Sequence, residues 1–351
     1  MDIVKLLRDA TEKQVSDIYI IAGLPASMRV NKNIVEESAE KLLPCDTQEM
    51  LEQLYKLANH RSMSTLLTTG DDDFSFSIRE LSRFRVSAFK QRGSLSAVIR
   101  VIRFTLPDHR QLNIPDSVMQ MADKRQGMVL VTGAAGSGKS TTLACMIDRI
   151  NQTRQAHVIT LEDPLEYLHH HNKSIVTQRE IGSDTESYVK ALRAALRQSP
   201  DIILLGEMRD YETIEVAMTA AETGHMLFST LHTIGAANTI ERIIDVFPAN
   251  QQRQIAIQLS MVLNAVVSQQ LVPTVDGGVI PAFEIMTVNP AIRTLIRDNK
   301  VHQIDGIIGN AATAEMCSMD ASLEKLYREN KITRDTAISY ASNPQLLQKR
   351  L

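Results

Sequence analysis

Residues 133–140 read Gly133-Ala134-Ala135-Gly136-Ser137-Gly138-Lys139-Ser140, and they fit the P-loop pattern G-x-x-x-x-G-K-[ST]. The apolar run 127–132 before them is predicted to form a strand, and residues 141–150 after them a helix. Glycines let such a loop bend tightly and present backbone N–H groups to a phosphate, to which the following helix adds its positive N-terminal end. A chance glycine turn that ends in Lys-Ser would not need these flanks. The motif therefore predicts a nucleoside triphosphate site.

The residue types within this loop have separate tasks. Lys139 is expected to reach the β- and γ-phosphates, while the hydroxyl of Ser140 is expected to bind Mg²⁺. The cofactors implied are ATP and Mg²⁺. The predicted nucleotide-binding residues are Gly133, Ala134, Ala135, Gly136, Ser137, Gly138, Lys139, Ser140 and Thr141.

Length, composition and net charge limit the classes of protein to which the chain can belong. The chain has 351 residues, of which 44% are hydrophobic, so it can bury a large core and is expected to form two domains. Its net charge of −3 supplies no general basic field, and we expect no nucleic-acid partner. No apolar run approaches ~18 residues and no charged leader precedes an apolar stretch. The expected location is therefore the cytoplasm.

Polar residues follow three further apolar runs, at 157–161, 201–205 and 225–230. Strands that alternate with helices predict a parallel sheet with both faces covered. Ligands of such open sheets bind at the carboxyl ends of the strands. We therefore expect Glu162, Glu207 and His232 to converge near the phosphates held by Lys139.

ATP hydrolysis requires carboxylates for the metal and for the attacking water. Glu207 is the leading candidate for the water-activating base, and Glu162 for the second carboxylate, although the two roles could be exchanged. Both are also predicted Mg²⁺ ligands, partly through water. His232 is the candidate γ-phosphate contact. Arg209 either bridges subunits or pairs with Asp210.

The first hundred residues are predicted to form a separate α/β domain. Helical spacing of apolar residues marks 3–10, and Asp46-x-x-Glu49 is predicted to open a second helix as a capping box. Alternating apolar residues at 74–78 and 84–88, then a strand at about 95–103, predict an antiparallel sheet.

A hairpin centred on Arg92-Gly93 would place Arg85 directly opposite Arg100, with Phe84 and Val86 on the other face. Like charges placed opposite each other destabilise a sheet, so an anion is expected to visit this face. Two solvated surface arginines are the simpler interpretation. The functional interpretation is a pair of arginine fingers acting on another subunit, which raise phosphoryl-transfer rates by ~10³ to 10⁵.

Between residues 127 and 248 the chain resembles the secretion-type ATPases of type II and type IV pilus systems. Their Walker A, Asp box, Walker B and His box match residues 133–141, 160–166, 201–210 and 223–233. The resemblance implies a PAS-like α/β domain (1–105), a linker (106–114), a RecA-like ATPase core (115–288) and a helical C-terminal segment (289–351). It also implies a homohexamer whose ATP sites lie between the domains of adjacent subunits, where Arg85 and Arg100 reach the neighbour's nucleotide.

Three details resemble the pilus retraction branch of that family. The chain lacks the long leading domain and the four-cysteine zinc motif of the assembly ATPases, and the stretch Ala291-Ile292-Arg293-Thr294-Leu295-Ile296-Arg297-Asp298 is similar to the A-I-R-N-L-I-R-E element. As a helix, this stretch would bury Ile292, Leu295 and Ile296. It is either an ordinary surface helix or a surface for partners and ring coupling. Farther on, Asp320 and Thr333 are predicted N-caps of short helices.

The resemblance thus predicts a hexameric motor that disassembles pili through an inner-membrane platform protein, placed at the inner face of the cytoplasmic membrane. Within the same class it could instead drive assembly or secretion, or be an accessory retraction paralogue. From other classes, it could be a nucleotide-gated scaffold with little turnover, or a nucleic-acid translocase, which the acidic balance disfavours.

Overall fold

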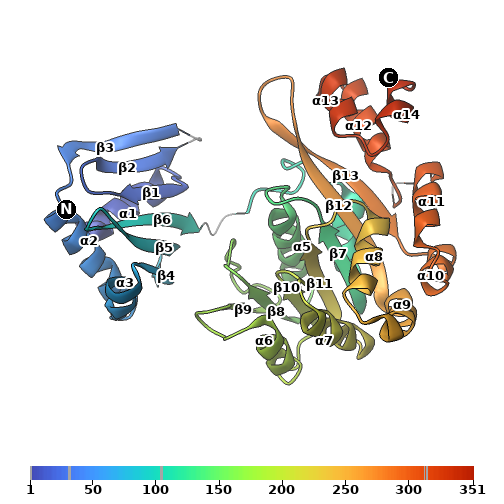
Figure 1. The fold of residues 1–351 in the computed structure, drawn as a ribbon, viewed down its shortest axis with the longest axis horizontal. Coiled ribbons are helices and arrows are strands. Elements are labelled where there is room, and N and C mark those ends of the chain that lie inside the picture. Colours follow the sequence, from blue (N-terminus) through green and yellow to red (C-terminus); the bar gives the residue numbers. More distant parts are fainter. Residues whose placement is uncertain (1, 31–32, 103–105, 312, 314) are drawn as a thin grey trace. The chain divides into compact units, whose positions relative to one another are not determined.

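The computed structural model describes residues 2–30, 33–102, 106–311, 313 and 315–351 (Figure 1). The chain divides into two compact units, Met1–Thr105 with Glu166–Leu168, and Leu106–Leu165 with His169–Leu351. Each unit combines helices with a sheet, so the predicted α/β class is confirmed. Over the described part of the chain, no helix is long and apolar enough to span a membrane.

The first unit contains a six-stranded antiparallel sheet in the order β3-β2-β1-β6-β5-β4. Alternation of apolar and polar residues buries one face, on which Phe74, Phe84 and Val86 lie in the core. The elements are α1 Ile3–Glu12, β1 Asp17–Ile20, β2 Pro25–Val30, β3 Asn33–Lys41, α2 Pro44–Leu57, α3 Ser64–Thr69, β4 Asp71–Ile78, β5 Ser82–Gln91 and β6 Ser94–Ile102. Strands β2 and β3 were not predicted, and Arg103 of the predicted third strand lies outside the described residues.

Helix α2 begins three residues earlier than the sequence predicts. Its N-cap is Leu43, with Pro44 at the first helical position, so Asp46 is the third helical residue rather than the cap. The carboxylate of Asp46 accepts a hydrogen bond from the Leu43 backbone nitrogen at 2.7 Å. The prediction that Asp46 is the N-cap is therefore wrong. Asp46 is instead the residue of a capping box whose side chain accepts a hydrogen bond from the backbone nitrogen of the N-cap.

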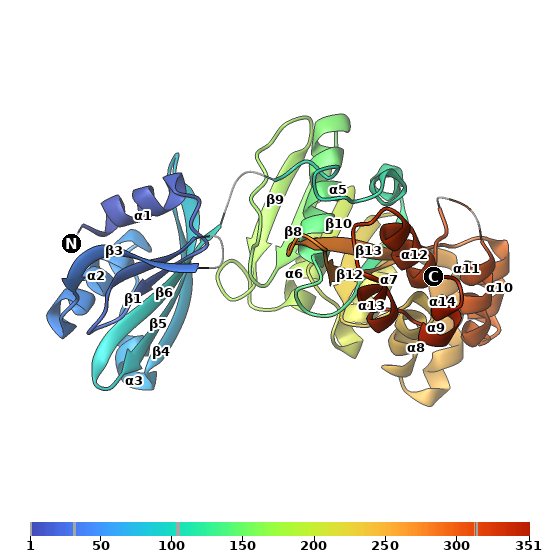
Figure 2. The ribbon, with the colours of Figure 1, turned by 90° about the horizontal axis from the view of Figure 1, so that it is seen from above.

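The second unit is built on a seven-stranded sheet in the order β13-β12-β7-β11-β10-β8-β9. Figure 2 shows its strands β8, β9 and β10 from above. All neighbouring strands are parallel except the β12–β13 pair. The strands are β7 Gly127–Thr132, β8 His157–Glu162, β9 Ile175–Glu180, β10 Ile202–Leu205, β11 Met226–Leu231, β12 Leu263–Pro273 and β13 Val279–Thr287. The helices are α4 Asp116–Met119, α5 Lys139–Thr153, α6 Tyr188–Ala195, α7 Tyr211–Glu222, α8 Ala236–Asp245 and α9 Ala249–Val262.

Both faces of this sheet are covered, because side chains of each strand alternate between two apolar clusters. Met128 and Leu130 of β7 pack with the residues of α6, α7, α8 and α9, while Val129 and Val131 pack with those of α5. Buried strands of this kind form the continuous apolar runs that the sequence shows.

The segment after residue 289 is helical, as predicted, with α10 Pro290–Arg297, α11 Ile304–Asn310, α12 Met319–Arg328, α13 Arg334–Ser339 and α14 Pro344–Gln348. The last three helices pack on the end of the β12–β13 hairpin through Val272, Ile280 and Ala282 (Figure 1). Thr333 caps α13 as predicted, but Ser318, not Asp320, caps α12.

Candidate nucleotide-binding site

The P-loop joins the end of β7 to the start of α5, in the strand–loop–helix context that the motif requires. Gly133, Gly136 and Gly138 all have positive φ, at 140°, 76° and 89°. A Cβ at Gly133 would lie 2.2 Å from the backbone oxygen of Gln269, so a side chain there would collide with backbone. Glycine is thus required at this position by close packing as well as by φ.

Two polar groups in the loop are arranged for an anion. The Lys139 ammonium donates to the backbone oxygens of Gly133 and Ala134, each at 2.9 Å, which places it over the loop. The Ser137 hydroxyl is buried and has no hydrogen-bond partner in the described structure. Buried polar groups are rarely left unsatisfied, so a phosphate oxygen in the loop fits this hydroxyl.

The strand order explains how the other predicted residues come to this edge. Along the sheet, the P-loop follows β7, His232 follows β11, and Glu207 follows β10, while Glu162 ends β8. These four strands are consecutive neighbours and all parallel, so their carboxyl ends form one continuous edge.

Glu207 is held by a guanidinium and an imidazole on this edge. Its Oε2 atom lies 2.7 Å from the Arg209 Nε and 3.3 Å from the His232 Nε2. The Glu207 side chain is 16% exposed, whereas those of Arg209 and His232 are 71% and 48% exposed. The structure thus brings Glu207 and His232 together.

The loop that carries Glu207 is fixed by the neighbouring strand. Thr230 Oγ1 donates to the Gly206 oxygen at 2.6 Å, and the Met208 nitrogen donates to the Thr230 oxygen at 3.1 Å. Arg209 therefore faces Glu207 and not Asp210, and Asp210 instead caps α7 through the Thr213 nitrogen. Pairing of Arg209 with Asp210, one of the two predicted options, is wrong.

Glu162 reaches the same neighbourhood from β8. Burial raises the pKa of the Tyr188 hydroxyl, and the carboxylates of Glu207, Asp163 and Glu162 raise it further. A Cβ on Gly206 would lie 2.9 Å from that hydroxyl, so Tyr188 stands directly beside the loop that precedes Glu207. The Tyr188 hydroxyl thus interacts electrostatically with both predicted carboxylates, those of Glu162 and Glu207.

These residues are suited to Mg²⁺ in a P-loop arrangement. The described residues contain no group of three or more His, Cys, Asp or Glu side chains placed to hold a metal by themselves. A P-loop metal instead takes one hydroxyl, the nucleotide's phosphates and water as ligands. Ser140 at the start of α5 supplies such a hydroxyl, and Glu162 and Glu207 lie at the same edge of the sheet, where they could bind water ligands of the metal.

The predicted arginine pair lies on the first unit's sheet. Arg85 of β5 is directly opposite Arg100 of β6, while Phe84 and Val86 are buried on the other face, as predicted. The register continues across β1, where Asp17 is opposite Arg100. Arg100 Nε lies 3.2 Å from Asp17 Oδ1.

Asp17 changes the electrostatic argument for this face. Its Oδ2 also lies 3.6 Å from Arg29 Nε on the opposite side, so one row runs Arg29, Asp17, Arg100, Arg85. Among the described residues no ion pair involves Arg85. Asp17 therefore supplies an anion for Arg100 within the same unit, and a role of Arg85 towards a phosphate stays a prediction.

Similarity to known proteins identifies the family. The model of a family described as "Type II/IV secretion system protein" matches residues 1–350. The chain belongs to this family. Its relatives include the type IV pilus retraction ATPase PilT of Pseudomonas aeruginosa, which is 41% identical over 98% of this chain and 99% of that protein.

Two further relatives bear on the branch of the family. The type IV pilus ATPase PilU of P. aeruginosa is 39% identical over 98% of this chain and 89% of that protein. The crystal structure of the pilus retraction motor PilT with bound ADP has a TM-score of 0.91 and 44% identity, and covers all of both chains. The predicted resemblance to retraction motors of this family is confirmed.

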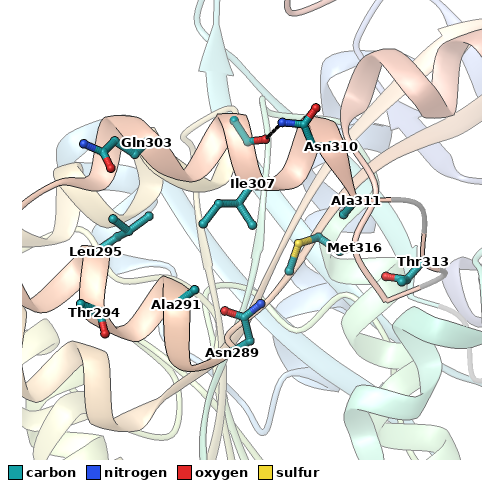
Figure 3. A pocket seen from close by; sticks show the side chains of 11 residues that line it. Asn289, Ala291, Thr294, Leu295, Gln303, Ile307, Asn310, Ala311, Thr313 and Met316 are labelled. Carbon is teal, nitrogen blue, oxygen red and sulfur yellow. Dashed lines mark hydrogen bonds between the residues drawn. The ribbon is translucent and has the colours of Figure 1, made fainter.

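The Ala291–Asp298 element forms α10, in which Ile292 and Ile296 are buried as predicted. Leu295 is only half-buried, because it lines a cavity of about 870 Å³ between α10 and α11 (Figure 3). Arg293 and Arg297 are exposed, and Arg293 donates to the Met261 oxygen at 3.2 Å. A role of this helix in partner binding or ring coupling stays a prediction.

Sequence reasoning missed Gln269, Tyr188 and Asp17. Tyr188 begins the helix after β9 and Gln269 lies mid-strand, so neither follows a predicted strand end. Asp17 left no such signal either, because its contact with Arg100 depends on the pairing of β1 with β6, a strand far along the chain.

Proposed function

We propose that the protein is a hexameric, Mg²⁺-dependent ATPase that powers type IV pilus retraction and twitching motility. The observation that carries this proposal is Glu207, oriented by Arg209 and His232 on the sheet edge that also bears the P-loop. A carboxylate fixed beside a phosphate-binding loop is the arrangement that hydrolysis by an activated water needs.

The P-loop would bind ATP through the backbone of residues 133–141, with Lys139 moving from its own loop oxygens to the β- and γ-phosphates. Ser140 would hold Mg²⁺, with Glu162 and Glu207 reaching it partly through water. When bound, Mg²⁺ offsets negative charge on the phosphates. His232 would contact the γ-phosphate.

Glu207 has one oxygen available for the attacking water. Both described contacts of its carboxylate, from Arg209 and His232, are to Oε2. We therefore assign Oε1 as the atom that accepts the proton of the water, while Arg209 and His232 hold the carboxylate still. General-base assistance of this kind accounts for ~10² to 10⁴ in rate.

The remaining parts of the site are proposed to come from a second subunit. Arg85, with Arg100 beside it, would reach the nucleotide of the neighbour and stabilise charge on the transferred phosphoryl group. The ring would act at the inner face of the cytoplasmic membrane on a platform protein of the pilus machinery. An accessory role beside another motor is the second candidate, because P. aeruginosa has two type IV pilus ATPases, PilT and PilU, that are nearly equally similar to this chain.

Surface pili, counted by electron microscopy in a host strain carrying Glu207→Gln, test this proposal. We expect excess pili and lost twitching, because assembly would continue without retraction. Glu222→Gln, an exposed carboxylate on α7, is the control and should leave both unchanged. Absent pili would indicate an assembly or secretion motor, and an unchanged pilus count would indicate an accessory role or a scaffold.

A second measurement separates a motor from a scaffold or a translocase. Purified protein should hydrolyse ATP at a rate that rises with protein concentration as rings form, and Glu207→Gln should lower that rate at least ~10²-fold. Nucleotide binding should persist, because Glu207 lies outside the P-loop. DNA and RNA should not stimulate the rate, and stimulation would contradict the pilus assignment.

A further inference from the structure

Gln269 of β12 lies directly beneath the P-loop, although it is far from it in sequence. Its backbone oxygen would be 2.2 Å from a Cβ on Gly133, and its side-chain Nε2 would be 2.8 Å from a Cβ on Gly138. The first and last glycines of the loop therefore both rest on this one residue. Gln269 is only 3% exposed, so it has little room to move.

The same side chain also reaches the helix that follows the loop. Thr142, in the first turn of α5, donates from Oγ1 to Gln269 Oε1 at 2.7 Å, and this hydrogen bond is buried. The bond fixes the amide so that its nitrogen faces Gly138. Gln269 thus contacts the loop where it begins, where it ends and where the helix starts.

We propose that Gln269 is a positioning residue that holds the P-loop in its phosphate-binding shape. The inference rests on the proposed nucleotide site and adds a residue to it. A loop with three glycines at positive φ has much conformational freedom, and ordering it on binding would weaken affinity. A rigid support beneath the loop removes that penalty before the nucleotide arrives.

The adjacent residue provides a matched control. Successive side chains of a strand point to opposite faces, so Gln270 points away from the P-loop. Its Nε2 donates to the Tyr340 oxygen at 3.4 Å, among the C-terminal helices. Gln269 and Gln270 have the same side chain on the same strand, and they differ in whether they touch the loop.

The test is the ADP affinity of the full chain, measured by isothermal titration calorimetry in the presence of Mg²⁺. Gln269→Leu and Thr142→Val should each raise the Kd for ADP about tenfold, because each breaks the hydrogen bond that holds the support of the loop, and binding must then order the loop. The double variant should be no weaker than the worse single variant, because both changes break the same hydrogen bond. Gln270→Leu and Thr142→Ser, which retains the hydroxyl, should stay within about twofold of wild type.

Steady-state kinetics add a readout that a loss of fold would not give. Gln269→Leu should raise KM for ATP by about the same factor as Kd, with kcat changed less than about threefold. A merely structural role would instead lower the active fraction, reducing kcat with KM unchanged. If Gln269→Leu does not fold, the Thr142→Val and Thr142→Ser pair decides, since these differ mainly in the hydroxyl.

The outcomes separate this inference from the proposed function. If wild-type protein binds no ADP, the nucleotide site itself is wrong. If wild type binds while Gln269→Leu and Thr142→Val bind equally well, the positioning role is overturned and the proposed function stands. Equal losses in Gln269→Leu and Gln270→Leu would also overturn it, because the effect would then belong to the strand rather than to the contact with the loop.

Discussion

His169 is a histidine whose burial changes its titration. Burial lowers the pKa of its imidazole from 6.5 to about 4. Between these values the unfolded chain binds a proton that the folded chain does not, so the free energy of unfolding falls as the pH drops from 6.5 to 4. We expect this group to contribute about 3 kcal/mol to the difference in stability between pH 7 and pH 4.

Chemical denaturation of wild type and His169→Gln across that pH range checks this expectation. The variant should lose less stability on acidification, and parallel curves for the two proteins would contradict it. His302→Gln, an exposed histidine, is the control and should follow wild type.

Individual residues could be predicted where local geometry fixes them. The opposition of Arg85 and Arg100 follows from the hairpin alone, because its turn sets the register of both strands. Asp17, the partner of Arg100, comes from a strand 83 positions away, and no local rule gives that pairing. The pairing of Arg100 with Asp17 could therefore not be predicted from the sequence, although the register that places Arg85 opposite Arg100 could.

The C-terminal helices depend on one buried carboxylate. Asp320 lies in the first turn of α12, and its two oxygens accept hydrogen bonds from the backbone nitrogens of Ser342, at 2.7 Å, and Asn343, at 3.0 Å. It thereby ties α12 to the segment that enters α14. The predicted N-cap role was wrong, because Ser318 already occupies that position and the true partners lie more than 20 residues ahead.

Removal of this carboxylate should loosen the C-terminal helices. We expect Asp320→Ala to lower the free energy of unfolding by about 2 to 4 kcal/mol, because two hydrogen bonds to a charged acceptor are lost and two backbone donors are left in a partly buried place. Asp335→Ala, in the exposed first turn of α13, should change it by less than about 0.5 kcal/mol. Equilibrium denaturation of both variants measures this difference, and equal effects would contradict it.

The elements of the second unit were the most predictable part of the chain. Four apolar runs became four neighbouring parallel strands, and their polar ends meet because parallel strands end at one edge. The antiparallel β12–β13 hairpin was not predicted, and Gln269, which lies in β12 beside the P-loop, was therefore missed. No sequence motif marks Gln269, because the residue it contacts, Thr142, lies more than 100 positions away in the sequence.

The proposed ring makes a prediction for the assembled molecule. Glu207→Gln and the Arg85→Ala, Arg100→Ala double variant should each be inactive as ATPases. If each site combines Glu207 of one subunit with the arginines of the next, mixed rings contain some interfaces with both groups intact. When the two variants are mixed in equal amounts, a site has about one chance in two of an intact Glu207 and one in two of intact arginines, so about a quarter of the sites are restored. Measurement of ATPase activity after co-refolding checks this, and complete inactivity of the mixture would place all these residues in one subunit.

The sheet face that carries Arg85 and Arg100 already contains a carboxylate, that of Asp17. With Arg29 on one side and Arg100 on the other, its carboxylate neutralises part of the positive row without any bound phosphate. In the proposed ring, a nucleotide of the neighbouring subunit would compete with Asp17 for Arg100, whose side chain is 66% exposed. Release of the nucleotide would then leave Arg100 paired with Asp17 rather than without a counter-charge.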